Sequence, residues 1–204
     1  MTESEQVLER IFKTKKISFN KIPESATRTP DYEVVAGFSK SFWEVKEICE
    51  NGDEKEIIRK FEADQGEIYS VHSKRVESSI KSASGQFKSF GVTNSPCIVV
   101  LTDVRDFSVR DICFELYIKS AMLGSAEYME FRDGSVREIN RKNGLMTNRM
   151  SYISAVALMY CSTDQLVFFH NPNTCNELPE YFFNKFSEHY KVVNTSIGLE
   201  WTKV

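Results

Sequence analysis

Residues 28–50, RTPDYEVVAGFSKSFWEVKEICE, contain two largely apolar segments separated by a short turn around residues 37–40. The composition of the segments and the length of the turn predict a β-hairpin with strands at DYEVVAG and KSFWEVKEIC. Charge inside an enclosed strand is costly unless it is paired or solvated. The hairpin nevertheless carries Asp31 at the start of its first strand, and Glu44 and Lys46 within its second. We therefore expect each of these three charged side chains to be paired with another residue, exposed to solvent or in contact with a bound ligand.

Alternate residues of a strand share a face, so Glu44 and Lys46 are expected to point the same way. If the two strands pair, the carboxylates of Asp31 and Glu44 can meet at one side of the sheet. Two carboxylates a few ångströms apart repel each other unless a proton or a cation lies between them. Oxygen ligands with room for water suit Mg²⁺ or Mn²⁺ better than zinc. An ammonium group beside them can offset charge that develops on a phosphate, so the pattern favours phosphodiester hydrolysis.

The order Pro30-Asp31, twelve residues, then Glu44-Val45-Lys46 resembles the PD-(D/E)XK motif of the restriction-endonuclease-like nuclease superfamily. The core of that superfamily is a helix, a hairpin that carries the motif, a crossover helix and a further strand. The segments expected between about residues 4 and 103 follow the same order. The resemblance implies that Asp31 and Glu44 are metal ligands, with the backbone carbonyl of Val45 as a possible third ligand. It also implies that Lys46 is the catalytic lysine.

Two weaker assignments follow from the same resemblance. Many members of the superfamily add an acid from the first helix, for which Glu9 and Glu5 are candidates. Some members place a glutamine of the crossover helix near the site, and Gln86 in SASGQF is similarly placed.

Each of these residues also has a purely structural interpretation. Asp31 can be a turn residue after proline, and Glu44 and Lys46 can form an ion pair on a solvated strand face. Glu9 can be an ordinary helix residue, and Gln86 a polar residue beside the apolar stripe of its helix.

The rest of the chain predicts an α/β fold, a central mixed β-sheet flanked by helices, which is restriction-endonuclease-like. One domain, 1–204, is expected, with the motif-bearing core at about 4–103 and additional strands and helices at about 104–204. The expected elements are a helix at 4–15 capped by Ser4, an edge strand or loop at 16–23, the hairpin, an undecided polar segment at 51–68, an amphipathic helix at 73–91, a buried strand at 95–104, a helix at 109–124, strands at 152–161 and 165–172, and a helix at 179–190.

Composition and charge indicate the kind of protein and its cellular location. The 204 residues are 41% hydrophobic and 27% charged, with a net charge of −3. There is no apolar run of about 18 residues, so no membrane span is expected, and the first residues do not resemble a secretory signal. Five widely spaced cysteines indicate reduced thiols and a cytoplasmic location. His72 and His170 are expected to be structural rather than catalytic.

Residues 10–28 carry six basic side chains against the single acid Glu24. Such a flank fits a phosphate-rich ligand, although a solvated helix face is the commoner meaning of a charge run. The expected function is therefore that of a nuclease dependent on Mg²⁺ or Mn²⁺, acting on nucleic acid with DNA favoured. A non-catalytic module on the same fold, binding nucleic acid or protein, is the alternative. Cutting both strands of a duplex needs two sites, which a homodimer would supply.

Overall fold

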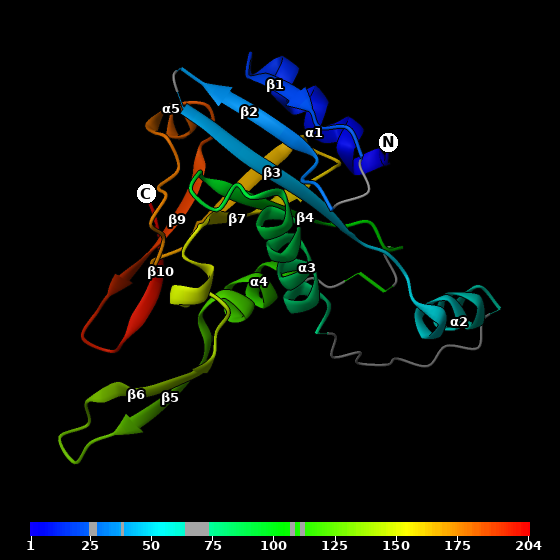
Figure 1. Ribbon diagram of the computed structural model, residues 1–204. Coiled ribbons are helices and arrows are strands. Elements are labelled where there is room, and N and C mark those ends of the chain that lie inside the picture. Colours follow the sequence, from blue (N-terminus) through cyan, green and yellow to red (C-terminus); the bar gives the residue numbers. More distant parts are fainter. Residues whose placement is uncertain (25–27, 38, 64–73, 107–108, 111–112) are drawn as a thin grey trace.

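The computed structural model describes residues 1–24, 28–37, 39–63, 74–106, 109–110 and 113–204 (Figure 1). Phe38 in the hairpin turn, residues 64–68 and His72 lie outside the described residues. At the centre is an eight-stranded mixed sheet with the order β1-β2-β3-β4-β7-β8-β9-β10. Its strands are β1 (Ser18–Lys21), β2 (Tyr32–Ala36), β3 (Ser39–Ile48), β4 (Cys97–Asp103), β7 (Ile153–Tyr160), β8 (Gln165–His170), β9 (Glu188–Asn194) and β10 (Leu199–Lys203).

Helices cover both faces of this sheet, as expected for an α/β fold. One hydrophobic core joins the sheet to α1 and α5, and contains Phe12, Trp43 and Phe182. The other core joins the opposite face to α3 and α4, and contains Phe42, Phe87 and Ile118. The helices are α1 (Glu3–Thr14), α2 (Gly52–Glu62), α3 (Arg75–Phe90), α4 (Phe114–Leu123), the short 3-10 helix η1 (Asn148–Met150) and α5 (Glu180–Phe183). Among the described residues, no helix is both long enough and apolar enough to cross a lipid bilayer.

The motif-bearing half of the chain follows the expected order of elements. β2 and β3 form an antiparallel hairpin in which Tyr32 lies opposite Trp43. β3 then pairs in parallel with β4, and β4 pairs in parallel with β7. β4 is buried from Cys97 to Thr102 because it has strands on both sides and helices on both faces. α3 ends at Gly91, whose φ of 80° is a left-handed helix cap.

The N-terminal helix begins slightly earlier than its sequence suggested. Ser4 was the expected cap, but Thr2 is the residue that caps α1. The Thr2 hydroxyl accepts the backbone N–H of Glu5, and the Glu5 carboxylate accepts the backbone N–H of Thr2. This reciprocal pair is a capping box, and it satisfies two backbone donors that the first turn leaves free.

Part of the polar segment after the hairpin, Gly52–Glu62, forms helix α2, which is held to the rest of the protein by ion pairs of a buried carboxylate. Glu54 in α2 is 1% exposed, and it accepts Arg105 at 2.8 Å and Arg75 at 2.7 Å. Arg105 also pairs with Asp103 at the end of β4, at 2.6 Å. A buried charge of this kind requires such partners because its desolvation is costly. Arg75 of α3 thus ties α2 to the body of the protein.

The prediction of a helix at 179–190 is wrong beyond Phe183. Only Glu180–Phe183 is helical, and residues 188–194 form β9. β9 pairs in parallel with β8, and the ring of Tyr190 stacks on that of Phe169 with centroids 5.5 Å apart. Pairing with an existing strand outweighs the helical spacing of the aromatic residues, because strand preference depends on neighbours more than on the residue itself.

A two-stranded sheet that was not expected from the sequence projects from the body of the protein (Figure 1). It consists of β5 (Gly124–Glu130) and β6 (Val136–Asn143). Most of its residues are exposed, so no apolar face marks it in the sequence. Gly124 has φ +80°, and a Cβ at that position would overlap the backbone carbonyl of Lys142. The ribbon therefore leaves α4 through a turn that requires glycine.

Candidate functional site

The start of the hairpin brings the first two candidate residues together. Asp31 immediately precedes β2, and its backbone N–H donates to the carbonyl of Trp43 in β3 at 3.0 Å. Trp43 and Val45 belong to the core on the α1 face, so alternation along β3 turns Glu44 toward α3. The two carboxyl groups are close enough to interact, because the negative charge of Asp31 raises the pKa of Glu44. The structure thus brings the two carboxyl groups close together.

Asp31 anchors itself to the second strand. Its Oδ2 accepts the backbone N–H of Val45 at 2.8 Å. Burial raises the pKa of the Asp31 carboxyl, while this hydrogen bond lowers it and the nearby acid Glu5 raises it further. Lys46 acts in the opposite sense and favours the charged form. Asp31 is therefore a carboxylate held in place by backbone rather than a loose turn residue.

Glu44 is the most perturbed acid of the group. Its side chain is 1% exposed, and its Oε1 pairs with Nζ of Lys46 at 2.6 Å. Its other oxygen, Oε2, is buried and makes no hydrogen bond of ordinary geometry with the described residues, although the Gln86 amide lies close enough to stabilise the charged carboxylate. Burial, followed by the charge of Asp31, raises the pKa of Glu44 to about 7, and Lys46 and Gln86 limit that rise. A buried carboxylate with one unsatisfied oxygen is the feature that a bound cation would explain.

Gln86 reaches the same place from α3. Its Nε2 donates to the backbone carbonyl of Thr29 at 3.0 Å, and its amide also favours the charged form of Glu44. It therefore links the crossover helix to the chain just before Asp31. The sequence-based placement of Gln86 beside the site agrees with this geometry.

The two candidate acids of α1 differ in their surroundings. Glu5 pairs with Lys21 at 2.7 Å and acts electrostatically on Asp31. Glu9 accepts the hydroxyl of Tyr32 at 3.3 Å and pairs with Lys13 at 3.3 Å. Glu5 therefore acts on the candidate site through Asp31, and Glu9 contacts the neighbouring residue Tyr32.

The possible ligands of a cation can now be stated. Among the described residues, no three His, Cys, Asp or Glu side chains cluster closely enough to hold a metal ion by themselves. The N–H of Val45 points to Asp31, and in an extended strand the C=O of a residue points to the same side as its N–H. The available donors are therefore the carboxylates of Asp31 and Glu44 and the carbonyl of Val45, with the remaining positions left to water, as Mg²⁺ prefers.

Half of the basic side chains at 10–28 are paired within the protein. Three of the six each contact an acid, two of them on α1 and one in the turn between β7 and β8. The pairs are Arg10–Asp164 at 2.5 Å, Lys13–Glu9 at 3.3 Å and Lys21–Glu5 at 2.7 Å. Ion pairing thus partly neutralises the charge of this flank.

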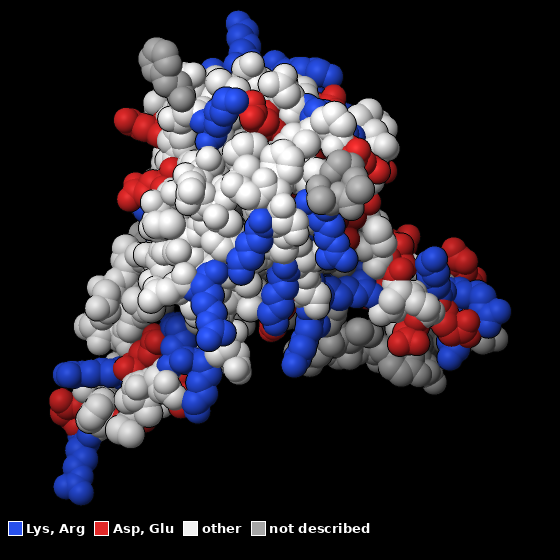
Figure 2. All heavy atoms as spheres, in the orientation of Figure 1, with Lys and Arg blue, Asp and Glu red and all other residues white. Residues whose placement is uncertain are grey.

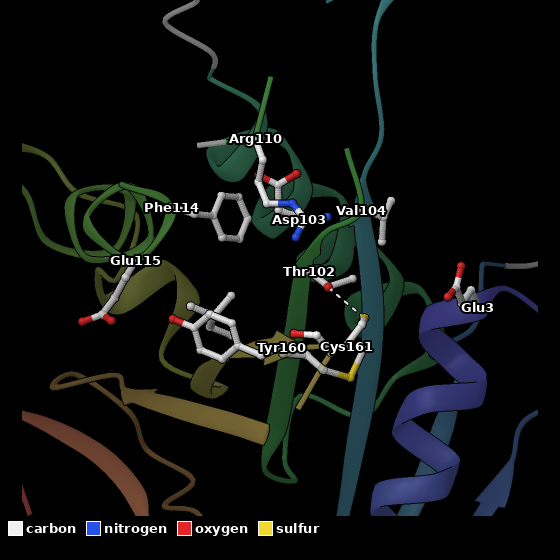
Figure 3. Close-up of a pocket in the computed structure, with 12 residues that line it drawn as sticks. Glu3, Thr102, Asp103, Val104, Arg110, Phe114, Glu115, Tyr160 and Cys161 are labelled. Atoms are coloured by element: carbon white, nitrogen blue, oxygen red, sulfur yellow. Dashed lines mark hydrogen bonds between the residues drawn. The ribbon is translucent and has the colours of Figure 1, made fainter. Parts of the chain in front are cut away.

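A cavity of about 550 Å³ lies elsewhere, at the carboxyl ends of β4 and β7 (Figure 3). Asp103 and Arg110 lie on one side of it, and Tyr160 and Cys161 on another. No motif in the sequence marked these residues. Asp103 is already paired with Arg105, whereas Glu44 keeps an unsatisfied buried oxygen. For that reason the acids of the hairpin, and not this cavity, are the candidate site.

The histidine expected to be structural lies in the core. His170 is buried, and its Nε2 lies 2.9 Å from Nδ1 of His189. Burial lowers the pKa of His170 to about 3, with help from His189 and Lys191. The ring of His170 also stacks on Phe183 at 4.9 Å between centroids. These contacts describe a neutral, packed imidazole.

Comparison of the chain with known proteins gives no match to a family model, to a curated protein or to a solved structure.

Proposed function

We propose that this protein is a divalent-cation-dependent nuclease with Asp31, Glu44 and Lys46 at its active site. The observation that carries the proposal is the state of Glu44. It is a buried carboxylate that faces a second carboxylate, pairs with a lysine on one oxygen and leaves the other oxygen unsatisfied. The order of elements from α1 to β4 is consistent with a restriction-endonuclease-like core, and the motif spacing resembles that superfamily.

The residues present fit a small hard cation. Asp31, Glu44 and the carbonyl of Val45 would hold it, and its charge would offset the repulsion that now raises the pKa of Glu44. When bound, Mg²⁺ or Mn²⁺ would polarise the phosphate and make an attacking water more acidic. Lys46, which is 23% exposed, would place its ammonium beside the reacting phosphate and stabilise the charge that develops there. Gln86 would hold the segment before Asp31 through the carbonyl of Thr29.

Cleavage of plasmid DNA, and of single-stranded DNA and RNA, with Mg²⁺ or Mn²⁺ tests the proposal. Lys46→Ala should reduce the rate of cleavage by about 10²-fold or more, because charge stabilisation in the transition state is lost. Lys40→Ala is the matched control, since Lys40 lies on the same strand, is exposed and pairs with another acid, Glu33, at 3.1 Å. The control should cleave within about twofold of the wild type.

Thermal unfolding of both variants shows whether each is folded. Undiminished cleavage by a folded Lys46→Ala protein would show that Lys46 has no catalytic role. Cleavage that needs two sites would also depend on protein concentration, as expected of a homodimer.

One observation favours the alternative, a binding module without catalysis. The ion pair of Lys46 with Glu44 at 2.6 Å neutralises both charges without a cation. That module would bind no cation at Asp31 and Glu44. Calorimetric titration with Mn²⁺ separates the two proposals: the nuclease should bind one ion, and Asp31→Asn should weaken that binding by at least about tenfold. No heat of binding in the wild type would favour the module.

A further inference from the structure

A row of lysines follows the exposed side of the crossover helix α3. Lys74 at its N-cap, Lys81 and Lys88 are seven residues apart and all three are exposed. A step of seven residues returns to nearly the same side of a helix, about 20° away, and advances by about 10 Å. The three ammonium groups therefore form a line about 20 Å long, which is called the lysine row below.

Among the described residues, other positive charge gathers near this row. Figure 2 shows Lys and Arg side chains collected over α3 and η1, in the gap between α2 and the projecting ribbon. Arg149 of η1 is exposed there. Glu77 is the only acid in the sequence of α3, and it contacts Lys81 at 3.4 Å. In a chain of net charge −3, such a face is not a consequence of overall composition.

Small residues lie between the lysine row and the candidate site. By helical geometry, Ser78, Ser82, Gly85 and Ser89 occupy the sector of α3 between the lysines and Gln86. The three serines are exposed, and a Cβ at Gly85 would meet nothing within 4 Å. A ligand can therefore approach the backbone of α3 closely, with cations on one flank and Gln86, which reaches toward Glu44, on the other.

We infer that the exposed face of α3 binds the phosphate backbone of a nucleic acid and leads it to the site at Asp31 and Glu44. This inference rests on the proposed function, because it names the surface that holds the substrate. A line of cations about 20 Å long is complementary to a polyanion with repeated charges rather than to a single phosphate group. Serine hydroxyls are common donors to phosphate oxygens. The sector carries no apolar anchor of the kind that membrane-binding helices insert into lipid.

The test measures binding without cleavage. Fluorescence anisotropy with a labelled DNA duplex and a single strand, in EDTA, is recorded between about 50 and 200 mM salt. Replacing Lys81 and Lys88 together by alanine should reduce the slope of log affinity against log salt by about 1.8 for the duplex, since each phosphate contact contributes about 0.9. Glu77→Gln should strengthen binding, because it removes the one acid of the helix.

A charge reversal provides the matched control. The side chain of Lys81 is 55% exposed and its partner Glu77 is 32% exposed. Lys203 on β10 is 52% exposed, and its partner Glu188 is likewise 32% exposed. Lys81→Glu should weaken binding by about tenfold or more at the lower salt concentration, and Lys203→Glu should leave it within about twofold. Equal effects of the two reversals would overturn the inference, because binding would then follow net charge.

The outcomes separate this inference from the proposed function. Lys46→Ala should bind DNA and fail to cleave it. If the wild type binds through the lysine row and never cleaves with Mg²⁺ or Mn²⁺, the surface stands and the nuclease proposal fails. If the wild type cleaves and the alanine pair binds as tightly as the wild type, the surface inference fails alone. Binding to anionic vesicles through the row, without binding to either oligonucleotide, would also overturn it.

Discussion

At the scale of the residue, Glu44 is the candidate site residue with the largest shift in pKa. A carboxylate that is buried beside another carboxylate is destabilised in its charged form, and the pKa of Glu44 accordingly rises from 4.5 to about 7. Lys46 offsets part of this cost through its ion pair. The proton and a divalent cation are alternative ways to relieve the same repulsion, so pH and cation concentration should act on one group.

The sign of the pH dependence follows from that pKa. The folded protein binds the Glu44 proton more tightly than the unfolded chain does, so this group favours folding most below about pH 4.5 and less as the pH rises to about 7. Glu44→Gln removes the effect. Without divalent cations, the free energy of unfolding of the variant should exceed that of the wild type at pH 8 by up to about 3 kcal/mol, from roughly 1.4 kcal/mol per pKa unit.

Urea unfolding at pH 8 and at pH 4.5 checks this prediction, and the difference between the two proteins should vanish at the lower pH. Adding Mg²⁺ at pH 8 should stabilise the wild type and not the variant, since a ligand of the folded state adds to its stability. A variant that is destabilised equally at both pH values would indicate that Glu44 has only a packing role.

At the scale of the element, two glycines illustrate how differently one residue type is used. Gly124 joins α4 to the projecting ribbon with φ +80°, where a Cβ would overlap the carbonyl of Lys142. Gly85 lies in the middle of α3, where a Cβ would meet nothing within 4 Å. The first glycine is required by geometry, and the second only weakens its helix.

Alanine at these positions should therefore have opposite effects. Gly85→Ala should stabilise the protein by roughly 0.5–1 kcal/mol, the difference between the helix propensities of the two residues. Gly124→Ala should destabilise it by about 1–3 kcal/mol, because both the backbone conformation and the close contact oppose a side chain. Urea unfolding measures both. A stabilising Gly124→Ala would show that the ribbon can leave the helix by another path.

Predictability from sequence also differs among the elements. The apolar stripe of α3 and the continuous β-branched run of β4 are local signals, and both elements lie where they were expected. β9 is a strand because β8 offers it an edge, which no local pattern records. The ribbon of β5 and β6 is stabilised by its own cross-strand pairs rather than by a buried face, so the alternation that predicts strands is missing from its sequence.

At the scale of the whole molecule, folding rearranges the charges that the sequence presents in order. Three basic residues near the N-terminus form ion pairs with Asp164, Glu9 and Glu5. The lysines of the row along α3, which are spread over fifteen positions in the sequence, come together on one side of one helix. The candidate acids meet because Asp31 is hydrogen-bonded to Trp43 and Val45, the two residues that flank Glu44 in β3.

The sequence by itself determined the α/β class, the hairpin, the crossover helix and the buried strand, because periodicity and turn residues act over a few positions. It also placed Glu44 and Lys46 on one face of the second strand, since alternation defines which residues can share a face. Only the tertiary structure decided that Glu44 is buried with one unsatisfied oxygen, that Glu5 acts on Asp31 and that residues 188–194 form a strand. Burial and electrostatic interaction depend on distances between segments far apart in the chain, and those distances exist only after the chain has folded.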